Sequence, residues 1–317
     1  MRVREYLVLF TLALFWGVSF LFIALGVKDV SPATLVVGRL AFSVATLGVI
    51  VAVQPKLIAG WRRYWKLGVL VGVVNNVLPF LLISAGEQQI ASGVASILNA
   101  TTPLFTVLLA NWWGGDREPL TWQRGVGVLL GFLGVGVLVG PAALHFAGNN
   151  VPQLIGEIAV LIAALSYGVG ALLSRRFAGS SPLVGPLTMQ TSALIIVIPV
   201  ALLWAPPTHL PTLRALIAMA ELGILGTAVA YLLYFWLIRH VGATRTSIVT
   251  YLLPCTALFW GALFNKEVIT WNSLAGLALV LLGTMATNGT IGLWWRRYAA
   301  ARAARVSVAA GSGNLES

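Results

Sequence analysis

The second half of this chain repeats the residue pattern of the first half at a separation of 151 residues. The correspondence places Trp16 on Tyr167, Gly72 on Gly223, Ser96 on Ser247 and Pro103 on Pro254. After a two-residue gap it resumes at a separation of 149, and Glu118 falls on Glu267. A duplicated half inside a very apolar chain is typical of membrane transporters. The pattern predicts a fold made of two halves of similar structure.

The composition places both halves in a lipid bilayer. Hydrophobic residues make up 59% of the chain and charged residues 9%, and the mean hydropathy is +0.92. Too little polar surface is available to cover a soluble globule. The apolar segments, each of about 19 to 25 residues, have the length a helix needs to cross the hydrocarbon core. They lie at 6–26, 32–53, 66–86, 92–112, 122–140, 154–174, 182–204, 214–238, 245–264 and 271–291.

These segments predict an all-α integral membrane protein with ten transmembrane helices around a central cavity. Five helices per half is an odd number, so the second half enters the membrane from the opposite side and the repeats are inverted. We expect a first repeat at 1–140, an outer linker at 141–153, a second repeat at 154–291 and a cytoplasmic tail at 292–317. The tail ends in residues that resemble a cloning remnant.

The net charge of +11 is explained by the membrane topology rather than by a nucleic-acid partner. Among the 20 Lys and Arg residues, the outer loops hold only Lys28, Arg214 and Lys266, and Arg39 lies within a helix. The others fall in inner segments when both termini are cytoplasmic, as the positive-inside rule requires. This predicts a multi-pass protein of a bacterial-type inner (plasma) membrane.

Residues that could carry catalysis are nearly absent. No metalloprotease, P-loop or nucleophile-elbow motif occurs, and Cys255 is the only cysteine. We therefore expect no enzyme activity, no cofactor and no metal site. The expected partners are a small-molecule substrate and the lipid bilayer, and we expect the chain to function as a monomer.

Polar and aromatic side chains inside the helices must face the bundle interior or water, because burying them in lipid without partners is costly. Several are matched by the repeat: Arg39 corresponds to Gln190, and Asn76 to Thr227. We predict that they line one substrate cavity, although aromatic packing alone would explain any single ring. The set is Trp16, Ser19, Arg39, Asn75, Asn76, Phe80, Asn99, Tyr167, Gln190, Thr227, Tyr231, Trp236, Ser247 and Tyr251.

Arg39 is the one basic residue of this set. A mid-membrane arginine costs roughly 2.5–3.5 kcal/mol on insertion scales, so it needs a reason to be there. One hypothesis is that it attracts a substrate carboxylate or phosphate. The alternative is that it extends to the outer interface or pairs with Glu221.

Two further pairs concern the ends and bends of helices. Pro103 and Pro254 are expected mid-helix, where proline removes a backbone donor, and they act either as hinges of the cavity or as static kinks. Glu118 and Glu267 precede Thr121 and Thr270, and are expected to support the starts of the fifth and tenth helices. In the fifth helix, the motifs at 127–131 and 136–140 predict close helix packing through glycine.

The motifs Trp16-Gly17-x-Ser19-Phe20, Pro32 followed by Arg39-Leu40, and Ala91-Ser92 leading to Pro103 and Glu118 recur in part as Gly242-Ala243, Pro254 and Glu267. This arrangement resembles the EamA family of ten-helix exporters in the drug/metabolite transporter superfamily, over residues 6–291. The resemblance implies export of amino acids or similar metabolites by alternating access, as in YddG-type aromatic amino-acid exporters.

A mostly neutral, aromatic cavity suits a zwitterion with an apolar or aromatic side chain. A multidrug exporter of lipophilic cations stays open as an alternative, with Glu221 as its membrane carboxylate. A membrane channel is a second alternative, although the chain has no charged ring or carbonyl filter motif. Proton coupling and facilitated diffusion are both compatible with the sequence.

Overall fold

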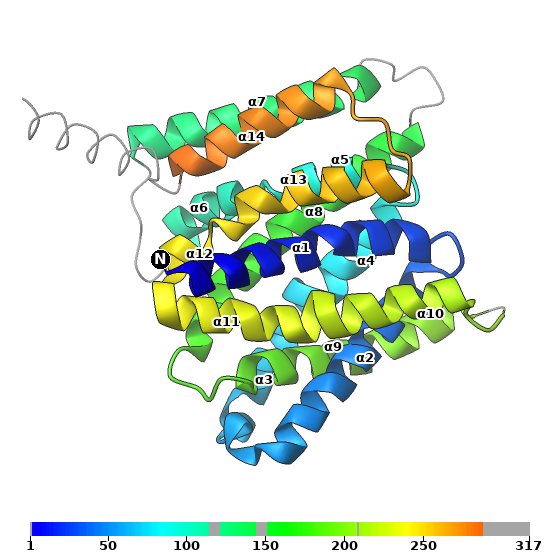
Figure 1. The fold of residues 1–317 in the computed structure, drawn as a ribbon, viewed down its shortest axis with the longest axis vertical. Coiled ribbons are helices and arrows are strands. Elements are labelled where there is room, and N and C mark those ends of the chain that lie inside the picture. Colours follow the sequence, from blue (N-terminus) through cyan, green and yellow to red (C-terminus); the bar gives the residue numbers. More distant parts are fainter. Residues whose placement is uncertain (1, 114–120, 144–150, 208, 288–317) are drawn as a thin grey trace, which may run out of the picture.

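The computed structural model describes residues 2–113, 121–143, 151–207 and 209–287, and every regular element in these ranges is helical. Most helices run side by side across the view in Figure 1, with α7 and α14 along one edge and α2 and α3 at the other. Of the expected outer linker, residues 144–150 lie outside the described ranges, as does the whole expected tail at 292–317.

The first half runs from α1 to α7. Its elements are α1 (Val3–Gly26), α2 (Pro32–Val53), the 3-10 turn η1 (Pro55–Ile58), α3 (Trp61–Gly72), the π-helical η2 (Val73–Val77), α4 (Leu78–Gly86), α5 (Ser92–Asn99), α6 (Thr102–Trp113) and α7 (Trp122–Ala143).

The second half follows the same order. Its elements are α8 (Val151–Ser174), the 3-10 turn η3 (Arg175–Phe177), α9 (Val184–Trp204), α10 (Leu213–Ala220), the π-helical η4 (Glu221–Val229), α11 (Ala230–Val241), α12 (Ala243–Thr246), α13 (Val249–Phe264) and α14 (Trp271–Thr287).

In the described ranges, 8 helices are long and apolar enough to cross a membrane, and the apolar helices Val249–Phe264 and Trp271–Thr287 are shorter. Their positions agree with the segments expected from hydropathy, and the tenth segment is helical as far as Thr287. Trp112, Trp204 and Trp271 are among the large side chains left exposed on this bundle. A helical membrane protein is therefore the observed architecture.

The contacts of one half are repeated in the other. α1 packs against α13, and its counterpart α8 packs against α6; α4 packs against α8, and α11 against α1. α2 packs against α9, and α7 against α14, so equivalent helices also meet each other (Figure 1). The two halves therefore interlock rather than stand as separate bundles.

The carboxylate end of the bundle is the end that holds Asp29, Glu87 and Glu267, which follow α1, α4 and α13. α1 ends there. α8 begins there as well: a Cβ on Gly156, in its second turn, would lie 2.9 Å from the carbonyl oxygen of Gly86 at the end of α4. α1 and α8 thus run in opposite directions through the bundle.

The fourth and ninth segments are both broken, at residues 100–101 and 247–248. Pro254 lies inside α13 as expected, whereas Pro103 stands in the first turn of α6, where a missing N–H costs little. Hydroxyl groups accompany the breaks: Thr102 Oγ1 donates to the carbonyl oxygen of Asn99 at 2.8 Å, and Thr250 Oγ1 to that of Ser247 at 2.7 Å.

The π-helical elements η2 and η4 were not expected, and they occupy equivalent positions in the two halves. η2 follows Gly72 and η4 contains Gly223, and each of these glycines lies close to the backbone of a neighbouring helix. A Cβ on Gly72 would lie 2.5 Å from the carbonyl oxygen of Met189, and one on Gly223 would lie 2.5 Å from that of Arg39. A π-helical turn widens the helix locally and often marks a functional site.

Two expectations about helix ends and packing need correction. Glu267 does not support the start of α14; its carboxylate accepts the backbone N–H groups of Ser92 and Gly93, and so caps α5 of the other half. α14 is capped by Thr270, whose Oγ1 accepts the N–H of Ser273 at 3.2 Å. Glu118, its repeat counterpart, lies outside the described ranges.

The glycine contacts between α7 and α14 are confirmed for Gly127, where a Cβ would lie 2.7 Å from the carbonyl oxygen of Gly283. The prediction is wrong for Gly136 and Gly140. A Cβ at either position would have no neighbouring atom within 4 Å, so neither residue packs closely against α14.

We therefore expect Gly127→Ala to destabilise the protein, since its methyl group meets backbone that cannot move aside. Overpacking of this kind costs about 1–3 kcal/mol. Gly136→Ala, in the same helix but in open space, is the matched control and should leave stability unchanged or raise it. Thermal unfolding in lipid nanodiscs checks both, and equal melting temperatures for the two variants would contradict the packing described here.

Candidate functional site

Arg39 of α2 is the centre of a buried polar group that joins the two halves. Its side chain is 9% exposed, and Nε donates to Thr227 Oγ1 of η4 at 3.0 Å. Its guanidinium carbon lies 3.7 Å from the centre of the Phe80 ring in α4, a cation–π contact. Thr227 in turn donates to the carbonyl oxygen of Leu222 at 2.7 Å, five residues earlier, as the π-helical turn permits.

No carboxylate of the described residues forms an ion pair with Arg39 at 4.0 Å or less. Glu221 is close enough to interact with it electrostatically, yet both Glu221 oxygens lack a hydrogen-bond partner in the described ranges. The pairing with Glu221 that the sequence left open is therefore not formed. Thr227 and the Phe80 ring leave the terminal guanidinium nitrogens without an anion.

The repeat counterparts of Arg39 and Thr227 are Gln190 of α9 and Asn76 of η2, and both are fully buried. Ser43 of α2 donates to Gln190 Oε1. Gln190 Nε2 and both polar atoms of Asn76 have no partner among the described residues. Buried amides are normally hydrogen-bonded, so this cluster keeps polar capacity that a ligand or water could use.

Aromatic rings flank this cluster. Asn75 Nδ2 donates to the Tyr231 hydroxyl at 3.1 Å, across the two halves. Tyr231 stacks on Phe235 with ring centres 6.3 Å apart, and Trp16 lies 5.6 Å from Tyr234. Tyr167 packs on the same core cluster as Phe80. Trp16, Asn75, Tyr167 and Tyr231 are all half-buried, so they keep accessible surface.

The other predicted residues are placed by contacts with groups other than Arg39. Trp236 stacks on His240 at 4.0 Å and lies under Arg4, near the start of α1. Asn99 ends α5, Ser247 lies in the break before α13, and Tyr251 lies in the first turn of α13. Ser19 donates to the carbonyl oxygen of Phe15 in its own helix and faces Gly226 of η4.

Ser43 was missed by the sequence reasoning. It is fully buried and bonds Gln190, the residue matched with Arg39. The available signal was its spacing, because a residue four positions after Arg39 lies on the same helix face. Glu87, which is treated below, was also missed; it directly follows the helix expected at 66–86, outside the segments searched for interior polar residues.

Comparison with known proteins now adds to this geometry. The EamA-like transporter family matches residues 3–140 and again residues 154–289. The chain belongs to this family. Two matches in tandem agree with the duplicated pattern, and each covers one half of the bundle.

Several EamA relatives match nearly end to end. The chain is 24% identical to the transporter YoaV of Bacillus subtilis over 91% of its own length and 98% of that protein. It is 26% identical to the inner membrane transporter YedA of Escherichia coli, covering 89% and 94% of the two chains. A transporter of Archaeoglobus fulgidus is also 26% identical, over 88% and 97%.

A solved crystal structure shares the fold, with a TM-score of 0.65 at 20% sequence identity, over 94% of this chain and 99% of the other. The family and these relatives together identify the EamA chain as a multi-pass membrane transporter.

Thr227→Val should weaken transport, because the valine keeps the shape of the side chain and removes the hydrogen-bond acceptor of Arg39. A lost hydrogen bond of this kind corresponds to an increase of about 3- to 10-fold in the substrate concentration for half-maximal flux. The matched control is Thr46→Val on α2, where Oγ1 donates only to the carbonyl oxygen of Phe42. Flux in proteoliposomes is the measurement, and equal effects of both variants would show that the Arg39 contact is irrelevant.

Proposed function

We propose that this transporter exports amino acids with apolar or aromatic side chains, or similar small metabolites, and that Arg39 binds their carboxylate. The observation that supports this is a guanidinium inside the bundle that pairs with no carboxylate of the described residues. A cation in that position is costly unless an anion compensates it. The carboxylate of a substrate supplies such an anion, and two parallel N–H bonds from arginine suit its geometry.

The rest of the cluster favours a neutral or zwitterionic ligand with an apolar body. The flanking groups are rings and amides: Phe80, Tyr167, Tyr231, Asn76 and Gln190. Rings offer apolar surface to the substrate side chain, and the unpartnered amides offer hydrogen bonds to its polar head. Arg39 on one side and Gln190 on the other make the site asymmetric, as a substrate with one anionic group requires.

Transport then proceeds by alternating access between two inverted five-helix repeats, 1–140 and 154–291, joined by an outer linker at 141–153. The opposed directions of α1 and α8 and the repeated helix contacts support this proposal. Exchanging the conformations of two such halves opens the shared site to one side and then the other. The segments broken near Pro103 and Pro254 serve as the bending points.

In this proposal the chain crosses a bacterial-type inner membrane ten times as a monomer, with both termini and the tail at 292–317 in the cytoplasm. The basic inner segments support that orientation. The carboxylate end of the bundle then faces outward, and the end at which α1 begins faces the cytoplasm.

Arg39→Ala should lower counterflow of radiolabelled L-phenylalanine in proteoliposomes by about 10- to 100-fold, the range for losing a charged hydrogen bond. Arg39→Lys keeps the charge without the bidentate geometry and should retain an intermediate rate. Arg62→Ala, an exposed residue at the start of α3, is the control and should behave as the unaltered protein. Full counterflow by Arg39→Ala would rule out the proposed role.

A second candidate function rests on Glu221 of η4. Its carboxylate is 9% exposed and has no hydrogen-bond partner among the described residues. A buried carboxylate without a partner attracts cations, so it favours an exporter of lipophilic cations.

Glu221→Gln separates the two functions. If the substrate is a lipophilic cation, this variant should abolish export of tetraphenylphosphonium, whereas Arg39→Ala should not. If the substrate is an amino acid, phenylalanine counterflow should depend on Arg39 far more than on Glu221. Parallel flux measurements of both substrates in the same vesicles decide between them.

A further inference from the structure

A pocket at the carboxylate end lies apart from the Arg39 cluster. Its volume is about 500 Å³, within the range of small-molecule sites. Three segments form it: the end of α1, the residues after α4 and the residues after α13. Its polar lining is Lys28, Glu87, Gln88, Gln89, Asn265 and Glu267, and Ala24, Val27 and Ile90 supply apolar surface.

Glu87 is the unsatisfied group of this pocket. Its side chain is 6% exposed, and neither carboxyl oxygen has a hydrogen-bond partner in the described ranges. A backbone group of Ala24 is close enough to favour its charged form. Glu267 differs, because it accepts from the N–H groups of Ser92 and Gly93 and from Asn265 Nδ2 at 2.9 Å. Glu87 is therefore the carboxylate left for a ligand.

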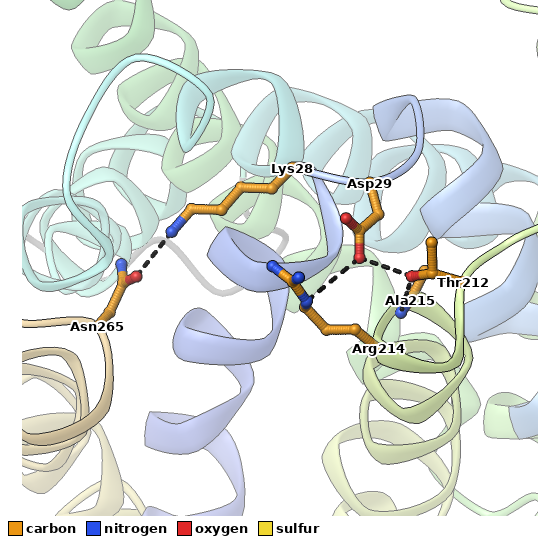
Figure 2. A network of polar contacts seen from close by, with 6 residues as sticks. All are labelled: Lys28, Asp29, Thr212, Arg214, Ala215 and Asn265. Carbon is orange, nitrogen blue, oxygen red and sulfur yellow. Dashed lines mark hydrogen bonds and ion pairs between the residues drawn. The ribbon is translucent and has the colours of Figure 1, made fainter.

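A positive group stands at the rim of the same pocket. Lys28 Nζ donates to Asn265 Oδ1 at 2.8 Å, which leaves two of its three N–H donors (Figure 2). The neighbouring Asp29 turns to the other side, where it accepts from Thr212 at 2.7 Å and pairs with Arg214 at 3.5 Å (Figure 2). Lys28 is thus held in place by an amide rather than neutralised by Asp29.

We propose that this pocket is a second, outer site for the head group of an amino acid, with the ammonium on Glu87 and the carboxylate on Lys28. The inference rests on the proposed export of amino acids, and adds a site that the substrate occupies after leaving Arg39. One unpartnered carboxylate and one ammonium in a small pocket match a zwitterion. The described residues contain no group of three or more His, Cys, Asp or Glu side chains suited to a metal ion.

The protonation of Glu87 makes such binding depend on pH. Glu87 follows the last residue of α4, and its burial, with the adjacent Glu267, raises its pKa well above the usual range. The charged groups on the surrounding elements are Lys28, Asp29, Arg39, Glu157, Lys266 and Glu267. The empty pocket thus favours the neutral acid, and an arriving ammonium favours the carboxylate, so one proton leaves to the outer solution for each ammonium bound. Affinity should rise with pH until Glu87 is ionised in the empty pocket as well.

The experiment measures equilibrium binding of radiolabelled L-phenylalanine to the full chain in lipid nanodiscs, with the Arg39→Ala change present so that the central site is silent. We expect residual binding in this background. Adding Glu87→Gln should weaken it about tenfold or more, the range for a hydrogen bond to a charged group, and remove its pH dependence. Glu157→Gln is the matched control: that carboxylate is also buried near this end, but does not line the pocket.

Ligand fragments assign the two charges. Phenethylamine should depend on Glu87 and be indifferent to Lys28→Met, whereas phenylalanine should lose affinity with either change, and 3-phenylpropionate should not need Glu87. Lys28 is exposed, so Lys28→Met should not disturb folding. Its effect on phenylalanine binding still tests the outer site if Glu87→Gln folds poorly.

The outer site is overturned if the Arg39→Ala protein binds no phenylalanine, or if Glu87→Gln and Glu157→Gln bind it equally. Neither result affects Arg39-dependent counterflow, which is measured separately. A loss of the proposed function itself would appear instead as full counterflow by Arg39→Ala.

Discussion

Every backbone N–H and C=O group inside a bilayer must find a hydrogen-bond partner within the protein, and this requirement governs where the helices of this transporter can break. The breaks coincide with hydroxyl groups that supply partners. Thr101 and Thr102 donate to the carbonyl oxygens of Leu98 and Asn99 at the end of α5, and Thr227 donates to that of Leu222 in η4. Threonine hydroxyl groups thus satisfy carbonyl oxygens at the interruption after α5 and at the π-helical turn η4, which lies beside Arg39.

Because the two halves repeat each other, positions at which their residues differ are informative. Gly72 and Gly223 bring η2 and η4 close to the backbone of α9 and α2, and each of these contacts has polar residues nearby. Each pair spans the two halves: Arg39 of α2 is joined to Thr227 of η4 by a hydrogen bond, whereas the equivalent pair, Gln190 of α9 and Asn76 of η2, keeps polar atoms without a partner among the described residues. Packing alone would be satisfied by like residues in both positions. This difference in charge lies where we propose that the carboxylate of the substrate binds.

Much of the architecture could be predicted from the sequence, because apolar length and the repeat act over whole segments. Examples are the bounds of α2, which match the expected segment at 32–53, and the burial of Arg39 inside the bundle. What could not be predicted depends on contacts between segments distant in the chain. Glu267 reads as a cap for the helix that follows it, yet it binds α5 of the other half. Glu87 reads as a loop residue, and only the approach of the segments after α1 and α13 buries it. The π-helical turns leave no pattern in hydropathy.

The placement of charge also gives the proposed export a direction. Asp29, Glu87, Glu157 and Glu267 lie at the carboxylate end, and Glu221 and Glu87 are within electrostatic reach of the Arg39 guanidinium. Interactions between charges are strong where water is excluded. In the proposed export, a zwitterion bound at Arg39 through its carboxylate has Glu221 and Glu87 within electrostatic reach, and the arrival of its ammonium shifts Glu87 from the neutral acid to the carboxylate. In the outer pocket, Glu87 and Lys28 again offer one negative and one positive group to the two charges of a zwitterion. On this proposal a substrate lacking either charge loses one of these two interactions, so we expect selectivity for zwitterions along the route as well as at the central site.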